Sequence, residues 1–199
     1  MTRGFYHERP CQLPACVRSP HVSKGSTPKL DIKIGEFDVK MKLISETEAL
    51  AKLGTLKDDL RSNIAAYETK AQPCAACETP GACCLDEHFV NVRISRLEAI
   101  AIEQVIQTLP PVRRAAVDER ILNAAAAATE FFACPLYEKS IGCLVHNEAK
   151  PVPCIVHACY ERCEELPPDQ FQDSAELAID RLNRRVYRSN ISLLPLPVA

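Results

Sequence analysis

A cluster of closely spaced cysteines constrains this chain more than any other feature of its sequence. Cys74-Ala75-Ala76-Cys77 is followed a few residues later by the adjacent pair Cys83-Cys84. A second group follows further along the chain: Cys134, Cys143, Cys154, Cys159 and Cys163. Closely spaced thiolates are the ligands that a zinc ion or an iron–sulfur cluster requires. We therefore predict that these cysteines, nine of the eleven in the chain, are metal ligands.

The two tight cysteine motifs leave several arrangements open. A Cys-x-x-Cys pair brings two thiolates to one ion from a turn, but it also occurs in redox motifs, where a helix N-terminus lowers the thiol pKa. No clear helix follows Cys77, so the sequence favours a metal. Neighbouring side chains such as Cys83 and Cys84 diverge. The pair therefore indicates two metals, a cluster, or one ligand beside one packing thiol.

The composition and the N-terminal sequence favour a reducing compartment for this chain. The chain has 199 residues and a formal charge of −2, which gives no global electrostatic case for nucleic acid or an anionic membrane. No apolar run is long enough to span a bilayer, and residues 1–18 lack the apolar core of a secretory signal. We expect a cytoplasmic protein, in which thiols bind metal rather than form disulfides. No partner is indicated, and Cys11 and Cys16 are interpreted as free thiols of a tail.

The hydrophobic pattern predicts a mainly helical fold with the cysteines on connecting loops. Alternating apolar residues over 30–44 predict a short N-terminal β-hairpin. Capping-box patterns begin at Ser45 and Ser95, and prolines mark other boundaries. Helices are expected over 45–53 with Gly54 as its stop, 56–70, 95–107, 111–132, from Pro153 past Tyr160, and from Asp173 or Ser174 to about 189, with a frayed tail after Leu193.

These elements divide the chain into four parts. The expected divisions are a flexible tail (1–28), a hairpin and helical lead-in (29–69), a cysteine-cluster metal-binding domain (70–166), and a C-terminal helix with its tail (167–199). Cys159 and Cys163 are four residues apart and would share one face of a helix. His146 and His157 stand near cysteines, but each is more simply interpreted as a surface or hydrogen-bonding histidine.

The joint cysteine spacing resembles that of a known family. The carrying pattern is Cys74-x-x-Cys77, then Cys83-Cys84, a capped helix, Cys134-Pro135-Leu136, Cys143-Leu144-Val145-His146 and Pro153-Cys154. This pattern, over about residues 70–165, resembles the zinc- or iron-chelating cysteine-cluster family called YkgJ-like. The resemblance implies a metal centre held by the cysteines that match: Cys74, Cys77, Cys83, Cys84, Cys134, Cys143 and Cys154. Lys150-Pro151 stands where the family has Arg-Pro.

Two classes of function follow from this sequence. The first is a metal-binding protein whose thiolates hold Zn²⁺ or an iron–sulfur cluster. The second is an iron–sulfur-dependent enzyme, an oxidoreductase or a lysine-methylase-like group-transfer protein, as the resemblance implies. The chain has no glycine-rich phosphate loop and no Gly-x-Ser-x-Gly element. A basic stripe on the last helix is interpreted as the solvated face of an amphipathic helix: Arg181, Arg184, Arg185 and Arg188.

Overall fold

The fold was analysed on a computed structural model. It describes residues 42–71, 84, 92–126, 133–158, 160, 162–188 and 193–196. The hairpin predicted over 30–44 lies outside these residues, except for residues 42–44, which have no regular structure.

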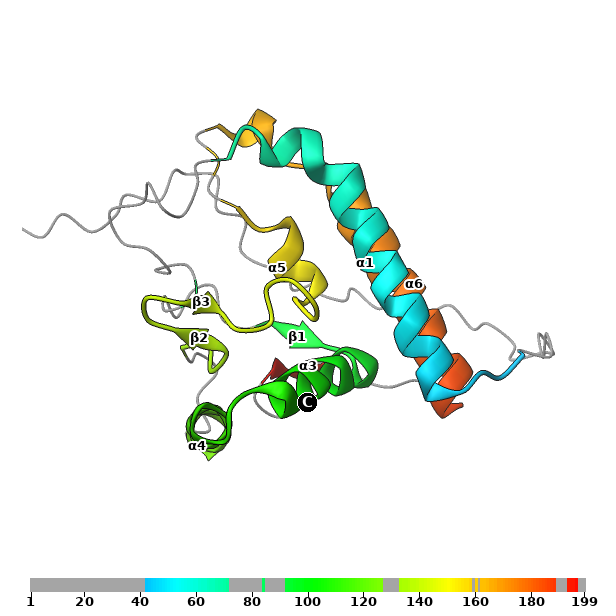
Figure 1. Cartoon of the computed structure of the whole chain (residues 1–199). Coiled ribbons are helices and arrows are strands. Elements are labelled where there is room, and N and C mark those ends of the chain that lie inside the picture. The colour runs from blue at the N-terminus through cyan, green and yellow to red at the C-terminus, as the bar shows by residue number, and fades with distance from the viewer. Residues whose placement is uncertain are drawn as a thin grey trace, which may run out of the picture.

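The described part of the chain is mainly helical, as predicted, and its few strands are very short. The elements are α1 (Glu46–Glu68), β1 (Arg93–Ile94), α3 (Arg96–Thr108), α4 (Pro111–Ala126), β2 (Tyr137–Glu138), β3 (Gly142–Cys143), α5 (Val152–Val156), the 3₁₀ turn η2 (Cys163–Glu165), α6 (Asp169–Tyr187) and β4 (Leu194–Pro195). The long helices α1 and α6 lie side by side, with α5 beside them and α3 across their lower part (Figure 1).

Helix α1 is continuous, so the predicted break at Gly54 is wrong. Ser45 caps the helix as predicted, because its hydroxyl accepts the N–H of Glu48 at 3.1 Å. A glycine inside a helix costs only about 1 kcal/mol. Beyond it the buried stripe continues through Leu60 and Ile64, which pack in the same core as Leu53. Tertiary packing against α6 therefore overrides the local preference to stop.

Two hydrophobic cores share helix α3. Ser95 and Glu98 form the predicted capping box at its start. The first core joins α1, α5, α6 and the start of α3: Ala49, Leu53, Leu60, Ile64, Leu97, Val152, Ile155, Ala175, Ile179 and Leu182. The second core lies on the rest of α3: Ile94, Ile102, Val105, Ile106, Val117, Leu136, Val145, Ala149 and Leu196. Ala101 packs against both cores.

The C-terminal segment is part of the fold, which corrects the prediction of a frayed tail after Leu193. Strand β4 pairs antiparallel with β1, with Ile94 opposite Leu194. The N–H of Leu196 donates to the carbonyl of Val92 at 2.9 Å. The Leu196 side chain is buried in the second core, and this burial holds the segment in place despite its prolines.

Two other helix predictions were wrong at their ends. Helix α6 begins at Asp169 rather than at Asp173 or Ser174, because the carbonyl of Pro168 accepts the N–H of Phe171 and starts the first turn earlier. Helix α5 ends at Val156, and His157 is extended rather than helical. Helix α4 is described only as far as Ala126, so the predicted end near 132 lies outside the described residues.

Candidate metal centre

Two cysteines of the second group occupy equivalent turns in a small hairpin. In Cys134–Tyr137 the carbonyl of Cys134 accepts the N–H of Tyr137 at 3.1 Å, and in Cys143–His146 the carbonyl of Cys143 accepts the N–H of His146 at 3.2 Å. Strands β2 and β3 connect the turns, with Tyr137 opposite Cys143. Backbone N–H groups also point at the sulfur atoms, from Leu136 toward Cys134 and from Val145 toward Cys143.

The buried neighbours of these cysteines explain why the turns are formed. Leu136 and Val145 each follow their cysteine by two residues, and both side chains are buried in the second core. The chain must therefore fold back over each sulfur atom, and this places the N–H of the same residue beside the thiol. Such N–H groups stabilise a thiolate, because hydrogen bonds to the charged form favour it.

A third thiol and a fourth cysteine adjoin the hairpin. Cys154 lies on α5 between Val152 and Ile155 of the first core, and its thiol is an electrostatic neighbour of both Cys134 and Cys143. The carbonyl of Cys84 accepts the N–H of Cys134 at 2.8 Å. Segments far apart in the sequence thus bring Cys84, Cys134, Cys143 and Cys154 to one place.

Burial favours the protonated form of three of these thiols: Cys134, Cys143 and Cys154. Burial raises the pKa of Cys134 to about 11, although the Leu136 N–H acts against it. Burial, together with the neighbouring Cys134, raises the pKa of Cys154 to about 12. Burial also raises the pKa of Cys143. A reactive, nucleophilic cysteine has a lowered pKa. The arrangement therefore suits thiols that ionise only when a cation replaces their protons.

Cationic side chains approach the thiols from several elements. The charge of Arg120 on α4 acts on Cys134, and that of Lys150 acts on Cys143 and Cys154. Cys154 in turn acts on Lys57 of α1. Lys150 thus supplies a positive charge at the position where the resembled family has arginine. Helix α4 also holds the hairpin directly, because Arg120 Nε donates to the carbonyl of Pro135 at 2.9 Å.

A buried ion pair, which sequence reasoning missed, lies beside Cys154. Lys57 Nζ is 3.3 Å from Glu98 Oε1, and the two residues are only 1% and 4% exposed. Burial lowers the pKa of Lys57, while Glu98 raises it. Glu98 also accepts the N–H of Val152 at 3.2 Å, which fixes the start of α5. The capping box identified Glu98 as a helix-start residue but gave no sign of Lys57 as its partner.

The remaining predicted ligands are only partly placed. Cys74, Cys77, Cys83 and Cys159 lie outside the described residues. Cys163 begins η2, a separate 3₁₀ turn, so the shared helical face predicted for Cys159 and Cys163 is wrong at Cys163. The thiols of Cys134, Cys143 and Cys154 are free of disulfides. Within the described ranges, no three His, Cys, Asp or Glu side chains already form a metal-binding group.

The predicted surface roles of the histidine and arginine residues are consistent with the structure. His146 is exposed, and its carbonyl accepts a hydrogen bond from Arg61 at 3.4 Å. In the basic stripe of α6, Arg184 pairs with Asp180 at 2.7 Å. Arg185 Nε donates to the carbonyl of Lys42 at 3.0 Å. Two of the four arginines of the stripe thus contact other groups of this chain at the surface of α6.

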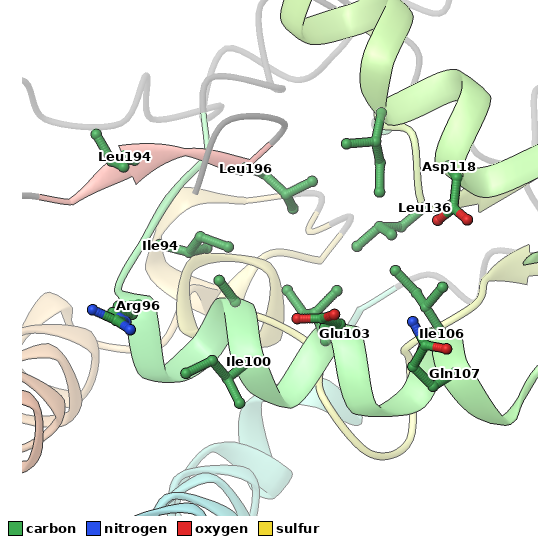
Figure 2. A pocket seen from close by; sticks show the side chains of 13 residues that line it. Ile94, Arg96, Ile100, Glu103, Ile106, Gln107, Asp118, Leu136, Leu194 and Leu196 are labelled. Carbon is green, nitrogen blue, oxygen red and sulfur yellow. The ribbon is translucent and has the colours of Figure 1, made fainter. Parts of the chain in front are cut away.

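A groove of about 550 Å³ lies over α3. Its apolar wall includes Ile100, Leu136 and Leu196, and the carboxylates of Glu103 and Asp118 lie along it. Figure 2 shows Leu136 and Leu196 pointing into the space that faces α3. Leu136 connects this groove to the cysteine turns, but the lining contains no cysteine or histidine.

No protein-family model matches the chain, and no curated protein or solved structure matches it either. The likeness to the YkgJ-like family therefore stays a prediction from cysteine spacing. In the part of the chain that the structure describes, no helix is both long enough and apolar enough to cross a membrane.

Proposed function

We propose that this protein is a metal-binding protein with a thiolate centre built from Cys84, Cys134, Cys143 and Cys154. Further ligands would come from the cysteines outside the described residues: Cys74, Cys77, Cys83 and Cys159. The centre holds Zn²⁺ or an iron–sulfur cluster, and a reducing compartment such as the cytoplasm keeps its thiols available. When bound, the metal supplies the positive charge that lets buried thiols ionise.

The pair of cysteine turns is the observation that carries this proposal. Each turn aims a backbone N–H at a sulfur atom, and the thiols of Cys134, Cys143 and Cys154 lie within electrostatic range of one another. Neutral packing thiols have no need of such donors, because a protonated thiol is only a weak acceptor. A thiolate needs them, since its charge is otherwise unsatisfied in a buried place.

The position of the site supports a structural role for the metal. Cys134 and Cys143 pack against the second core, whereas Cys154 lies between residues of the first core. A metal ion bound by all three would cross-link two cores that are otherwise joined through α3. Binding free energy at such a site is folding free energy.

Anaerobic purification followed by analysis of metal and acid-labile sulfide tests the proposal. One equivalent of zinc without iron or sulfide would identify a zinc centre. Iron with sulfide and a brown colour would identify a cluster, which is also the requirement of the enzyme alternative. A folded protein that binds neither metal would overturn the proposal.

Single Cys→Ser variants locate the ligands. Cys134→Ser, Cys143→Ser and Cys154→Ser should each lower the bound metal and the melting temperature of the loaded protein. Cys11→Ser is the matched control, because Cys11 lies in the predicted tail, and it should change neither. Equal metal content in all four variants would refute the assignment of these ligands.

A further inference from the structure

Lys57 and Arg120, near the cysteines, each have a buried nitrogen atom without a hydrogen-bond partner. Among the residues that the structure describes, the buried side-chain atoms in this condition are Lys57 Nζ, Arg120 Nη2, Glu138 Oε2 and Tyr160 Oη. Both residues are tied to the chain beside a proposed ligand. Arg120 Nε donates to the carbonyl of Pro135, which follows Cys134. Lys57 pairs with Glu98, which accepts the N–H of Val152, two residues before Cys154. Buried polar groups are normally paired, so each exception needs a reason.

Glu98, the partner of Lys57, uses only part of the hydrogen-bonding capacity of the Lys57 ammonium group. Glu98 Oε1 lies 3.3 Å from Lys57 Nζ and forms an ion pair with it. The same carboxylate accepts three other hydrogen bonds: Oε1 accepts the N–H of Val152, and Oε2 accepts both the N–H and the hydroxyl of Ser95. An ammonium group has three protons to donate. Lys57 therefore retains N–H donors that Glu98 does not use.

Arg120 also has a nitrogen atom without a partner, beside the first cysteine turn. Its Nε is committed to the carbonyl of Pro135 in the first cysteine turn, and this bond aims the guanidinium group at that turn. Its Nη2 atom is buried without a partner. Helix α4 thus places the guanidinium group of Arg120 near Cys134, and helix α1 places the ammonium group of Lys57 near Cys154.

We propose that Lys57 and Arg120 are the counter-cations of the thiolate centre, with Glu98 and Pro135 as the groups that position them. This inference rests on the proposed function, since the cations are needed only when the thiols are ionised. Four thiolates around one divalent metal carry a net charge of roughly −2. The positive charge of Arg120 and the remaining N–H donors of Lys57 would offset part of that charge, which is otherwise expensive to bury.

The test measures metal affinity apart from stability. Zn²⁺ and Co²⁺ are titrated against a competing chelator into the wild-type protein, Lys57→Met and Arg120→Met, and urea unfolding of each metal-free protein is followed separately. Each substitution should weaken binding about 10- to 100-fold, the usual effect of losing an outer-sphere partner of a metal site. Lys52→Met and Arg114→Met are matched controls on the same helices. Their side chains pair with Glu48 and Gln107 and should leave affinity unchanged.

Two further variants separate counter-charge from structural support. Lys57→Met/Glu98→Gln removes the whole ion pair, so it should recover stability relative to Lys57→Met but not metal affinity. Arg120→Lys retains a positive charge and should recover most of the affinity that Arg120→Met loses. If affinity instead returns together with stability in the double variant, the pair is only structural and the inference fails.

The outcomes also distinguish this inference from the proposed function. A wild-type protein that binds neither Zn²⁺ nor Co²⁺ overturns both. A wild-type protein that binds metal, with Lys57→Met and Arg120→Met binding it equally well, overturns the counter-cation role alone.

Discussion

Removal of the Glu98 carboxylate should be among the most damaging single changes in this protein. Glu98→Ala leaves the Lys57 ammonium buried at 1% exposure without its counter-charge. Removing one partner of a buried pair costs about 3–5 kcal/mol. The variant also strips the acceptor from the backbone N–H groups of Ser95 and Val152. These losses overlap, so we expect a total of about 4 kcal/mol, a large part of the ~5–15 kcal/mol that stabilises a typical domain.

Urea unfolding followed by far-ultraviolet circular dichroism measures this loss. Glu103→Ala is the matched control, because Glu103 is an exposed glutamate on the same helix, and its removal should change stability by no more than about 0.5 kcal/mol. Lys57→Met/Glu98→Gln should be more stable than Glu98→Ala, since it leaves no unpaired charge. If Glu98→Ala and Glu103→Ala differ by less than about 1 kcal/mol, the pair does not carry the energy that its burial implies.

Two further predictions concern other buried polar groups. Asn183→Ala should cost about 1–3 kcal/mol in thermal unfolding, because the Asn183 side chain accepts the N–H of Leu97 at 3.1 Å and joins α6 to α3, whereas the exposed Arg181→Ala should be close to neutral. Unfolding of the metal-free protein at a series of pH values tests the thiols: burial raises the pKa of Cys134 to about 11 and of Cys154 to about 12 from an ordinary 9.0. The folded state then holds protons that the unfolded chain releases, so this contribution is complete below pH 9.0 and is lost as the pH rises toward 12. Stability that is flat over that range would mean that the two thiols are not buried.

The helices of this fold follow from local signals in the sequence, and the errors come from distant contacts. Ser95 and Glu98 predicted the start of α3 because a capping box is a local pattern of four residues. The predicted break at Gly54 was wrong because a glycine destabilises a helix only locally and slightly. The apolar stripe that keeps α1 continuous is buried against α6, which lies more than a hundred residues away in the sequence. Strand β4 was missed for the same reason, since its partner Ile94 precedes it by a hundred residues.

The residues of the candidate site were likewise predicted from the sequence only in part. Cysteine spacing predicted Cys134, Cys143 and Cys154, which the fold brings together. Their cationic neighbours carry no such signature. A lysine such as Lys57, followed by two aspartates in an amphipathic helix, has the sequence of a solvated residue. Only the packing of α1 on α3 turns it toward the buried carboxylate of Glu98.

The sharing of α3 between the two cores has a consequence for how the molecule unfolds. Ala101 contacts both cores, so α3 is one mechanical connection between them, and a loaded thiolate centre would be a second. With both connections in place the cores must melt together, whereas with α3 alone one core can open while the other persists. Cooperativity itself would then depend on metal: a single sharp transition in the loaded protein, and a broad or two-step transition after chelation.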